Sequence, residues 1–389
     1  MTHAESSEEI KKLLAKYSDT NPEDWYLCLK ARFGISLVLK TLKKTIPETR
    51  TEVITTPFTC ITAINPILDA KYTPIYAPVD LKHLNLQSPE KLINKKTAAV
   101  ILQNTFGIVP PQLFSISRSK TSPLIIEDAA HSLTRMIKDS KGYPFADISI
   151  HSFGVEKILP TKFGAAIYIN PKLAKTKPEF YKKIIQSFKH LKRPNPLLAL
   201  RLITYRYSNG IINHIPGASK TKIRHFLGRC SIVETAIKPL ELNGRQESPV
   251  NTSAYVNNEI LKHLKQLPKN LHERTKNTSF IAAAVKKNKD ISLPNFNSNT
   301  PMLVVPILLK TPQKAENLYQ KLTEAGFYIR RWYNPPLYPG PAGPNILKNI
   351  YHYNIESHPI MKEISSRILC LPTDLSQRRT EKLIKLINK

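Results

Sequence analysis

Two stretches of the sequence place reactive side chains at the ends of apolar segments. In the first, the apolar run 124–126 leads to Asp128, and His131 follows after two alanines. In the second, a β-branched run ends on the hydroxyl of Ser152, and Lys157 follows before a tight turn. A carboxylate at a strand end can pair with a protonated heterocycle, and a lysine whose pKa falls in a dry pocket becomes a nucleophile. These residue types allow a ligand site, although a lysine in such a place is usually only a surface residue and an Asp before two alanines is commonly a helix cap.

The elements that must position these residues alternate along the first 170 residues. Apolar residues at helical spacing predict helices at 6–17 and 34–42. Six short β-branched runs predict strands at 52–56, 72–76, 98–102, 124–127, 148–152 and 165–169. Strands separated by helices are typical of an α/β domain with a largely parallel sheet, whose chemistry gathers at the carboxyl ends of the strands. We therefore expect residues 1–170 to form a large ligand-binding domain.

The composition changes after residue 170. Between residues 171 and 229 the sequence has fourteen lysines and arginines and a single acid, Glu179, with apolar residues at helical spacing between them. This pattern predicts basic amphipathic helices, and we assign 171–245 to a basic helical insertion. Two interpretations stay open. The insertion either is a solvated element that only adds charge, or binds an anionic membrane surface or another polyanion.

The remainder of the chain, 246–389, is predicted to form a small C-terminal α/β domain. Its expected elements are a helix that includes 255–264, a strand at 302–308, a helix at 312–325, a strand at 327–331, a proline- and glycine-rich loop at 334–344 and a helix at 380–387. Mixed strands and helices of this size are typical of a lid domain beside a larger α/β domain.

Composition sets the broad class of the protein. Hydrophobic residues make up 41% and charged residues 22% of the 389 residues, which is a globular balance. The formal charge of +29 predicts attraction to anions such as phosphorylated small molecules, anionic lipid or nucleic acid. Nucleic acid is the least favoured of these partners, because a general bias toward lysine would produce part of the same excess.

Cysteine and targeting patterns predict a compartment. The four cysteines are scattered, without a C-x-x-C pair or clustered histidines, which argues against a disulfide framework or a metal site. The first 17 residues lack the apolar core of a signal peptide, and no run of about 18 apolar residues occurs. We expect a cytoplasmic protein, with peripheral contact at the inner face of the membrane if the basic insertion binds lipid.

The two reactive segments resemble the DegT/DnrJ/StrS family of sugar aminotransferases, which are fold-type I enzymes that use pyridoxal 5′-phosphate (PLP). The family pattern is an E-D-x-A-[QH] strand end, then S-F-x-x-x-K, then a glycine-rich turn. Here Asp128 and His131 match the first part, and Ser152 and Lys157 match the second. Segments 55–59, 77–80, 100–107 and 367–373 also look like segments of the family.

This resemblance implies a divergent fold-type I PLP-dependent transferase and a role for each matching residue. Lys157 is the catalytic Schiff-base lysine, and Asp128 keeps the pyridine nitrogen of the cofactor protonated. The other implied cofactor-binding residues are His131 beside the ring, Ser152 at the phosphate, Phe58 stacked on the ring, and Ala31 and Arg32 on the first phosphate-binding loop. Arg331 and Tyr333 are possible substrate contacts. No metal is implied.

The resemblance also implies an activity: amino transfer from glutamate to a keto-sugar on a nucleotide diphosphate, in the biosynthesis of surface polysaccharide or a related glycan. The family works as a homodimer, which we also expect here. Relatives that eliminate a sugar hydroxyl carry histidine at the lysine position, so Lys157 favours amino transfer. The alternative is a catalytically degenerate scaffold that binds membrane or polyanion through its basic helices.

The sequence departs from the family at three places. These departures keep the non-catalytic scaffold as an alternative function. Glycines are missing from the first phosphate loop at 30–33 and from most of the turn at 162–165, and the arginine of the segment that reaches the partner subunit is missing near 248–252. Glycine allows close approach of the backbone to a ligand, so the phosphate is expected to be held more by charge than by backbone.

Overall fold

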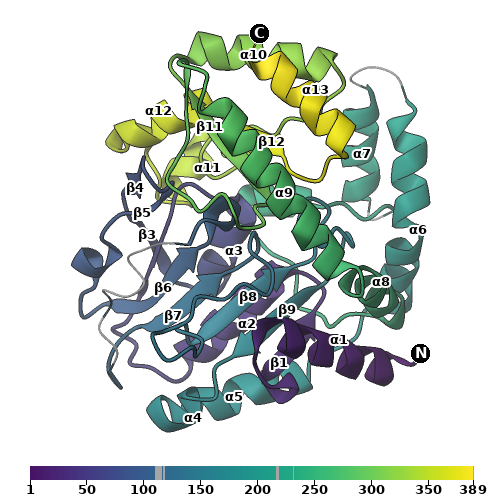
Figure 1. Cartoon of the computed structure of the whole chain (residues 1–389). Helices are drawn as coiled ribbons and strands as arrows, with labels where there is room; N and C mark the ends of the chain where they lie inside the picture. Colours follow the sequence, from purple (N-terminus) through teal and green to yellow (C-terminus); the bar gives the residue numbers. More distant parts are fainter. Residues whose placement is uncertain (110–115, 117–118, 216–218, 231, 389) are drawn as a thin grey trace.

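The computed structural model describes residues 1–109, 116, 119–215, 219–230 and 232–388, and its centre is a seven-stranded sheet (Figure 1). The strand order is β1-β9-β8-β7-β6-β2-β3, and every strand is parallel to the others except β9, which is antiparallel to both of its neighbours. The strands are β1 (Trp25–Cys28), β2 (Glu52–Thr55), β3 (Thr73–Tyr76), β6 (Thr97–Gln103), β7 (Leu124–Asp128), β8 (Ile148–Ser152) and β9 (Ala165–Ile169). A separate pair is formed by β4 (Val79–Asp80) and β5 (Asn85–Leu86). The α/β prediction and its six strands are confirmed, and β1 is an additional strand.

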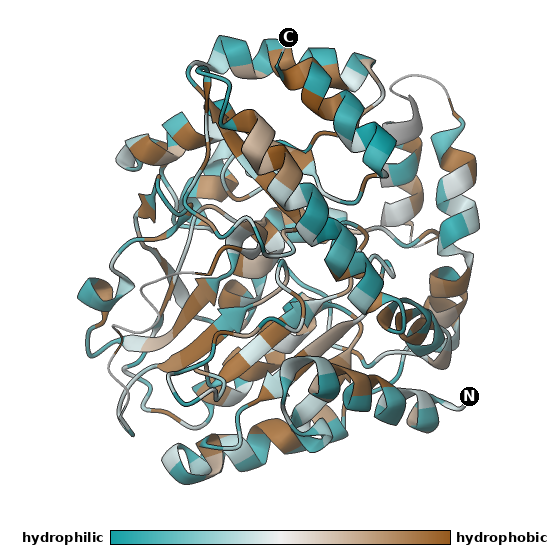
Figure 2. Ribbon diagram, in the orientation of Figure 1, coloured by the Kyte–Doolittle hydropathy of each residue, from teal (hydrophilic) through white to brown (hydrophobic). Residues whose placement is uncertain are grey.

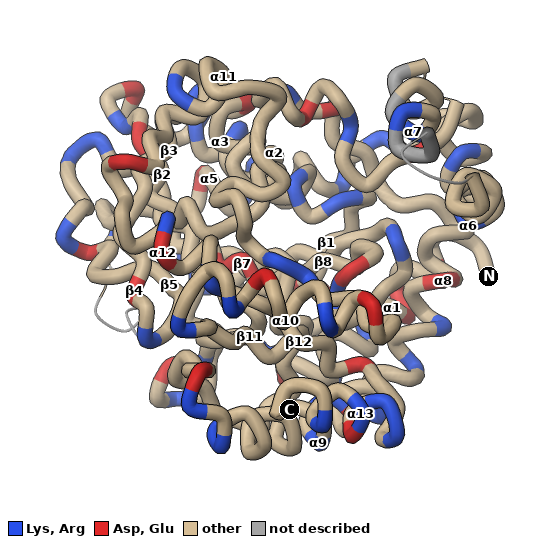
Figure 3. Tube along the Cα trace, turned by 90° about the horizontal axis from the view of Figure 1, so that it is seen from above, with Lys and Arg blue, Asp and Glu red and all other residues tan. Residues whose placement is uncertain are grey.

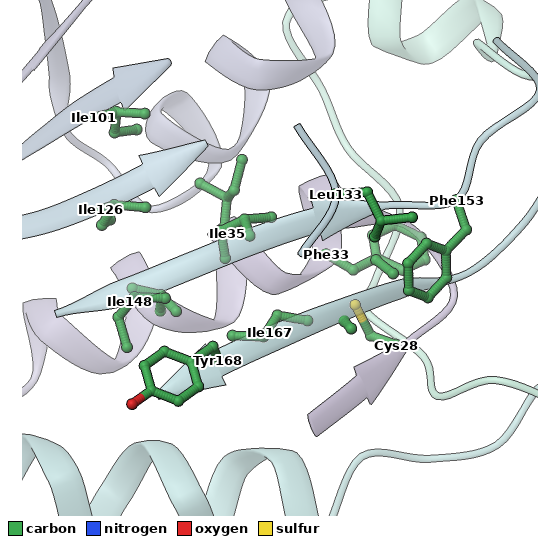
Figure 4. Close-up of a cluster of buried hydrophobic side chains, with 14 of the residues drawn as sticks. Cys28, Phe33, Ile35, Ile101, Ile126, Leu133, Ile148, Phe153, Ile167 and Tyr168 are labelled. Atoms are coloured by element: carbon green, nitrogen blue, oxygen red, sulfur yellow. The ribbon is translucent and has the colours of Figure 1, made fainter. Parts of the chain in front are cut away.

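The strands of this sheet are short apolar runs because both faces of the sheet are covered. Strands β6, β7 and β9 are buried along their whole length, as expected for a sheet packed between helices. The hydrophobic colour of the strands contrasts with the mixed colour of the surrounding helices (Figure 2). In the core, Ile126, Ile148 and Ile167 from three neighbouring strands cluster with Ile35 of a covering helix (Figure 4).

That covering helix is α2 (Ala31–Lys43), and its close packing depends on one glycine. A Cβ on Gly34 would lie 2.7 Å from Cγ1 of Ile167 on β9, so only glycine lets the helix approach the sheet this closely. The other helices of the first 190 residues are α1 (His3–Ser18), α3 (Ile61–Asp69), α4 (Leu173–Thr176) and α5 (Pro178–Lys189). The apolar residues of α5 belong to the same core, and Thr41 on α2 contacts Ser187 on α5.

The basic segment continues into two helices at one side of the molecule, α6 (Pro196–Asn213) and α7 (Ser219–Arg229) (Figure 1). They lie side by side, and Arg224 donates a hydrogen bond of 2.6 Å to Asn213. On α6 only Leu202 and Ile212 are buried. The chain then returns to the large domain through the 3-10 helix η5 (Pro239–Asn243), where Glu241 is fully buried.

The C-terminal portion carries a second sheet, with the antiparallel order β10-β11-β12. Its elements are β10 (Ile291–Ser292), β11 (Val304–Leu309), β12 (Ile368–Pro372), α8 (Ala254–Leu264), α9 (Leu267–Val285), α10 (Pro312–Glu324), α11 (Pro344–Asn349), α12 (Pro359–Arg367) and α13 (Gln377–Ile387). The helix α8 packs on α1, where Asn257 donates to Ser7 at 2.9 Å. From there α9 leads to the small sheet (Figure 1).

The expected strand at 327–331 is wrong. Only an isolated bridge between Arg330 and Cys370 forms there. The reason lies in the next residues: the chain leaves the edge of the small sheet so that Trp332 and Tyr333, both buried, can enter the space between the two domains. Among the described residues no helix combines the length and the apolar character needed to cross a membrane.

Candidate functional site

A cavity of about 220 Å³ lies where the large sheet meets the small domain. Most of the residues that line the cavity follow the carboxyl ends of the parallel strands or precede the antiparallel β9. Both groups therefore lie at the same edge of the sheet. The lining from the large domain includes Lys30, Ala31 and Arg32 after β1, Thr59, Cys60 and Thr62 after β2, Gln103 on β6, Asp128 and His131 on and after β7, Ser152, Glu156 and Lys157 on and after β8, and Lys162 and Gly164 before β9. Ala236, Ile237, Trp332, Tyr333 and Tyr338 close it from later segments.

Lys157 and His131 form the reactive pair of the cavity. Nδ1 of His131 accepts a hydrogen bond of 3.0 Å from the backbone N–H of Phe106, so the ring proton of neutral His131 lies on Nε2. That nitrogen is 2.8 Å from Nζ of Lys157. Burial lowers the pKa of both side chains, that of His131 well below its ordinary value. When the amine is neutral, its single lone pair accepts the hydrogen bond from Nε2 of neutral His131, and burial lowers the pKa of the amine toward that state.

Asp128 ends β7 in the same cavity, with 7% of its surface exposed. Its Oδ1 accepts from the N–H of Ala130 at 3.0 Å, and no other described residue donates a hydrogen bond to this carboxylate. Burial raises its pKa, while the charge of Lys157 acts in the opposite direction. A cationic ligand in the cavity would keep this carboxylate ionised.

The hydroxyl of Ser152 and the start of α2 form one end of the cavity. The first-turn N–H groups of Ala31 and Arg32 have no acceptor among the described residues, and Lys30 offers no side-chain cap. The turn before β9 joins the same place, because the N–H of Gly164 donates to the carbonyl of Leu29 at 2.7 Å. Free N–H groups at the positive end of a helix, next to a hydroxyl, favour a phosphate group.

The side chain of Arg32 does not supply a free positive charge to that end. Its Nε lies 2.7 Å from a carboxylate oxygen of Glu241, and its Nη2 donates to the carbonyl of Ala236 at 2.7 Å. The sequence-based role of Arg32 is therefore limited to its backbone. The pairing could not be foreseen, because Glu241 lies in the segment that we had assigned to the basic insertion.

Next to this pair lies a buried cluster of two lysines and two glutamates. Lys30 contacts Glu234 at 3.0 Å and Glu247 at 2.8 Å. Lys238 contacts Glu234 at 3.3 Å and also pairs with Glu247. The cluster ties the residue before α2 to the segment 234–247, so this later segment holds the start of α2 in place.

Phe58 does not line the cavity, which corrects the stacking role expected for it. It is fully buried and packs edge-on against Tyr333 and Phe106, with ring centroids 5.1 and 5.9 Å apart. From the same loop, Cys60 lines the cavity instead. Gln103 fixes this loop by accepting a hydrogen bond of 2.5 Å from Thr59.

The small domain contributes aromatic rings rather than the predicted arginine. Arg331 turns away and forms an ion pair of 2.7 Å with Glu316 on α10, so it does not line the cavity. Tyr333 does line it, as expected, and its hydroxyl lies 3.4 Å from Nε2 of His131. The neighbouring Trp332 stacks on His131 with centroids 5.6 Å apart and an interplanar angle of 8°.

A carboxylate next to the lysine joins the two domains. Oε1 of Glu156 accepts hydrogen bonds from the hydroxyl of Tyr328 at 2.6 Å and from Nε of Arg330 at 3.3 Å. Because Glu156 precedes Lys157 in the chain, the position of the small domain affects the backbone that carries the reactive amine.

Behind the cavity, Glu127 is a buried acid whose pKa burial raises from 4.5 to about 7, although Ser149 and Asn104 donate hydrogen bonds to it. Because its pKa is higher in the folded state, its contribution to stability is fully present below pH 4.5 and is lost as the pH rises to about 7. Between these two pH values, titration of Glu127 should lower the unfolding free energy of the wild type by on the order of 3 kcal/mol. Glu127→Gln should lack this contribution, so its unfolding free energy should depend less on pH. Denaturant titrations of the apoprotein measure this, with the exposed Glu324→Gln as control. Parallel curves for wild type and Glu127→Gln would contradict the prediction.

Comparison with known proteins shows which family and which solved structures the chain resembles. Residues 31–187 match the family model of the DegT/DnrJ/EryC1/StrS aminotransferase family. A stretch of 124 residues is 30% identical to the UDP-4-amino-4,6-dideoxy-N-acetyl-beta-L-altrosamine transaminase of Helicobacter pylori, and this stretch covers 31% of the present chain and 33% of that relative. The matched part thus spans about a third of the relative's length.

Solved structures extend the likeness to nearly the whole chain. Helicobacter pylori PseC, an aminotransferase involved in the biosynthesis of pseudoaminic acid, superposes with a TM-score of 0.69 at 18% identity, over 99% of this chain and 91% of that one. The PLP form of Spr1654 from Streptococcus pneumoniae gives a TM-score of 0.71 at 17% identity, over 98% and 90% of the two chains. At these identities the likeness shows the fold, which is that of the fold-type I sugar aminotransferases.

The family model covers the segment that carries most of the reactive residues. Asp128, His131, Ser152 and Lys157 all lie inside 31–187, and all four line the one cavity. This segment, about two fifths of the chain, is similar to the DegT/DnrJ/EryC1/StrS aminotransferase family.

Proposed function

We propose that the protein is a PLP-dependent aminotransferase that moves an amino group from glutamate to a keto-sugar carried on a nucleotide diphosphate. The observation that carries the proposal is that Lys157 and Asp128 face one cavity, with the start of α2 and Ser152 at its end. Such a cavity has a covalent anchor, a counter-ion and a phosphate cradle. The biosynthesis of surface polysaccharide or a related glycan is the setting that we propose for it.

The residues present fit PLP. A buried carboxylate without a second described donor suits a protonated ring nitrogen, and a buried amine whose pKa is lowered suits the aldehyde. Unsatisfied N–H groups at the start of α2 suit the phosphate. When bound, PLP supplies an electron sink conjugated to the nitrogen that is transferred.

The chain supplies the positioning and the proton transfers. Lys157 is placed to hold the cofactor and, once displaced, to move a proton at the substrate carbon that carries the nitrogen. Asp128 holds a proton at the ring nitrogen, and His131 orients Lys157 through its Nε2 proton. Trp332 and Tyr333 cover the amine from the small domain and exclude water from it.

Isotope transfer tests the proposed reaction. Protein loaded with PLP is incubated with glutamate labelled at the amino nitrogen and with a panel of keto-sugar nucleotides, and mass spectrometry follows the label. We expect label in one amino-sugar nucleotide. A protein that stays colourless after addition of PLP would overturn the proposal and favour the scaffold, whereas a coloured protein that uses another amino donor would overturn only glutamate as the donor.

We also propose that the protein is a homodimer. Sedimentation should then give twice the mass of one chain.

We further propose that α6 contacts an anionic membrane surface. Its exposed apolar residues follow one another at spacings of three or four, which places them on one face of the helix. They are Leu197, Leu200, Ile203, Tyr207 and Ile211, with exposed fractions between 44% and 73%. Exposed basic residues lie just before α6 and on it, among them Lys192, Arg193 and Arg206, and Glu179 is the single acid in 171–229, so the charge of this segment is complementary to anionic lipid (Figure 3).

Liposome co-sedimentation tests the membrane contact. The triple variant Leu200→Ser/Tyr207→Ser/Ile211→Ser is expected to lose most of the binding to vesicles that contain phosphatidylserine. A matched variant, Tyr143→Ser/Phe280→Ser/Ile360→Ser, removes exposed apolar residues elsewhere and should bind like wild type. Equal binding by both triple variants would refute the contact. A shift of the α6 variant from dimer to monomer would show instead that this face is a subunit interface.

A further inference from the structure

Arg330 lies beside the cavity and connects the carboxylate of Glu156 to the ring of Trp332. Its Nε donates to Oε1 of Glu156 at 3.3 Å. Its guanidinium carbon lies 5.2 Å from the centre of the Trp332 ring. A guanidinium over an indole at this distance is attracted by the π electrons of the ring, and removal from water strengthens the attraction. Only 11% of the Arg330 side chain is exposed, so it is held between a carboxylate and an indole.

The backbone that carries the guanidinium and the indole is fixed by the small sheet. The N–H of Cys370, on the buried strand β12, donates to the carbonyl of Arg330 at 2.8 Å. The thiol of Cys370 contacts the carbonyl of Trp332 at 3.5 Å. These two contacts set the point at which the chain leaves the small sheet. The orientation of the indole then depends on the groups that touch its ring.

The indole transmits this position to the reactive pair. Its ring is nearly parallel to that of His131, at 8°, with centroids 5.6 Å apart. Nζ of Lys157 lies 5.5 Å from the centre of the indole and 2.8 Å from Nε2 of His131. The contacts therefore form a closed circuit, because they begin at Glu156 and end at Lys157, its neighbour in the chain.

Arg330 also brings a positive charge close to the reactive amine. Burial lowers the pKa of Lys157, Asp128 and Glu156 oppose this effect, and Arg330 adds to it. The titratable and charged groups around the amine are Cys60 after β2, Asp128 and His131 at the end of β7, Glu156 after β8, and Arg330 and Tyr333 from the small domain. The small domain thus supplies the cation of this set that is not on the large sheet.

We infer that Arg330 is a positioning residue for the reactive amine, because it holds the indole of Trp332 against His131 and so keeps His131 in contact with Lys157. The same arrangement keeps the guanidinium charge near the amine, so Arg330 acts on it by charge as well as by packing. The inference rests on the proposed function only for the use that is made of the amine. Its test needs no cofactor.

The reactivity of Lys157 in the apoprotein, measured against pH, tests this role. Acetic anhydride modifies only the neutral amine, and mass spectrometry of the peptide that contains Lys157 gives the rate at each pH. In Arg330→Gln we expect the midpoint of this profile to move to higher pH, because a positive charge near the ammonium form is lost. At pH 7 the rate should fall about threefold to tenfold. Arg330→Lys keeps the charge and should restore most of the rate.

Glu156→Gln separates this role from that of a simple link between the domains, because it breaks the same ion pair. If the pair only held the domains together, both variants would expose the amine to water and move the midpoint to higher pH. We expect opposite directions instead, since Glu156→Gln removes a negative charge and should move the midpoint to lower pH. A shift to higher pH in Glu156→Gln would overturn the inference, even if Arg330→Gln does not fold.

Tryptophan fluorescence reports the packing step. Trp332→Phe gives the emission of Trp25, the other tryptophan of the chain, for subtraction. In Arg330→Gln the emission of Trp332, which is 6% exposed in the wild type, should shift to longer wavelength and be quenched more strongly by acrylamide.

Arg331→Gln is the matched control for both measurements. It removes the same charge one residue further along, from a side chain that pairs with Glu316 away from the cavity. Its pH profile and its emission should equal those of the wild type. An equal response of Arg331→Gln and Arg330→Gln would contradict the inference, and so would an unchanged profile in Arg330→Gln. Failure of the wild type to bind PLP would overturn the proposed function instead and leave these measurements valid.

Discussion

Replacement of Lys157 by alanine is expected to abolish amino transfer and the visible absorbance of the bound cofactor. The variant loses the amine that we propose holds PLP and moves the proton at the substrate carbon. General acid–base catalysis alone contributes on the order of 10²–10⁴-fold, so we expect kcat to fall by at least about a thousandfold. Absorbance spectra and single-turnover assays measure the two losses separately.

Two controls accompany this variant: a substitution of a surface lysine, and chemical trapping of the cofactor on the wild type. Lys175→Ala, an exposed lysine, should retain both colour and activity. Reduction of wild type with borohydride in the presence of PLP should attach the cofactor to the peptide that contains Lys157. Attachment to another lysine, or full activity in Lys157→Ala, would remove the basis of the proposed mechanism.

Asp128→Asn is expected to leave a protein that binds PLP but transfers amino groups at least about a hundredfold more slowly. The amide keeps an oxygen for the N–H of Ala130, so the local backbone should be preserved. It cannot stabilise a proton on the ring nitrogen as an ionised carboxylate does, and each pKa unit lost there corresponds to about 1.4 kcal/mol. The electron sink is weakened while the covalent anchor remains.

The comparison with Lys157→Ala makes this second prediction specific. Asp128→Asn should stay coloured, whereas Lys157→Ala should not. Asp128→Glu keeps the charge and should recover part of the rate. A variant Asp128→Asn with unchanged kcat would show that the carboxylate is not the partner of the ring nitrogen, even if Lys157 anchors the cofactor.

The sheet and the central pair were predictable because both depend on local patterns. Buried parallel strands appear as continuous apolar runs, and the chemistry of the site lies at their carboxyl ends. Asp128 and Ser152 are the last residues of β7 and β8, so their places followed once the strands were recognised. The short β1 was missed because its apolar run has only four residues and directly follows a proline-containing turn.

The remaining site residues depend on contacts between distant parts of the chain. The pairing of Arg32 with Glu241 joins residues about two hundred positions apart, and no local pattern reports such a contact. In the loop after β2, the choice between Phe58 and Cys60 depends on which side chain points toward the cavity. The packing of Tyr333 against Phe58 decides this, and it arises only when the small domain docks.

The buried cluster of Lys30, Lys238, Glu234 and Glu247 has a consequence for the effect of ionic strength. The pKa of Glu247 is lowered to about 2, because the ammonium groups of the two lysines outweigh the effect of burial. The two positive and two negative charges of the cluster cancel inside the protein, where dissolved ions screen their attraction poorly. The net charge of +29 therefore comes from the other charged residues, which are mostly at the surface. Added potassium chloride should therefore weaken the vesicle binding that we propose for α6, while the buried cluster beside the first turn of α2 persists.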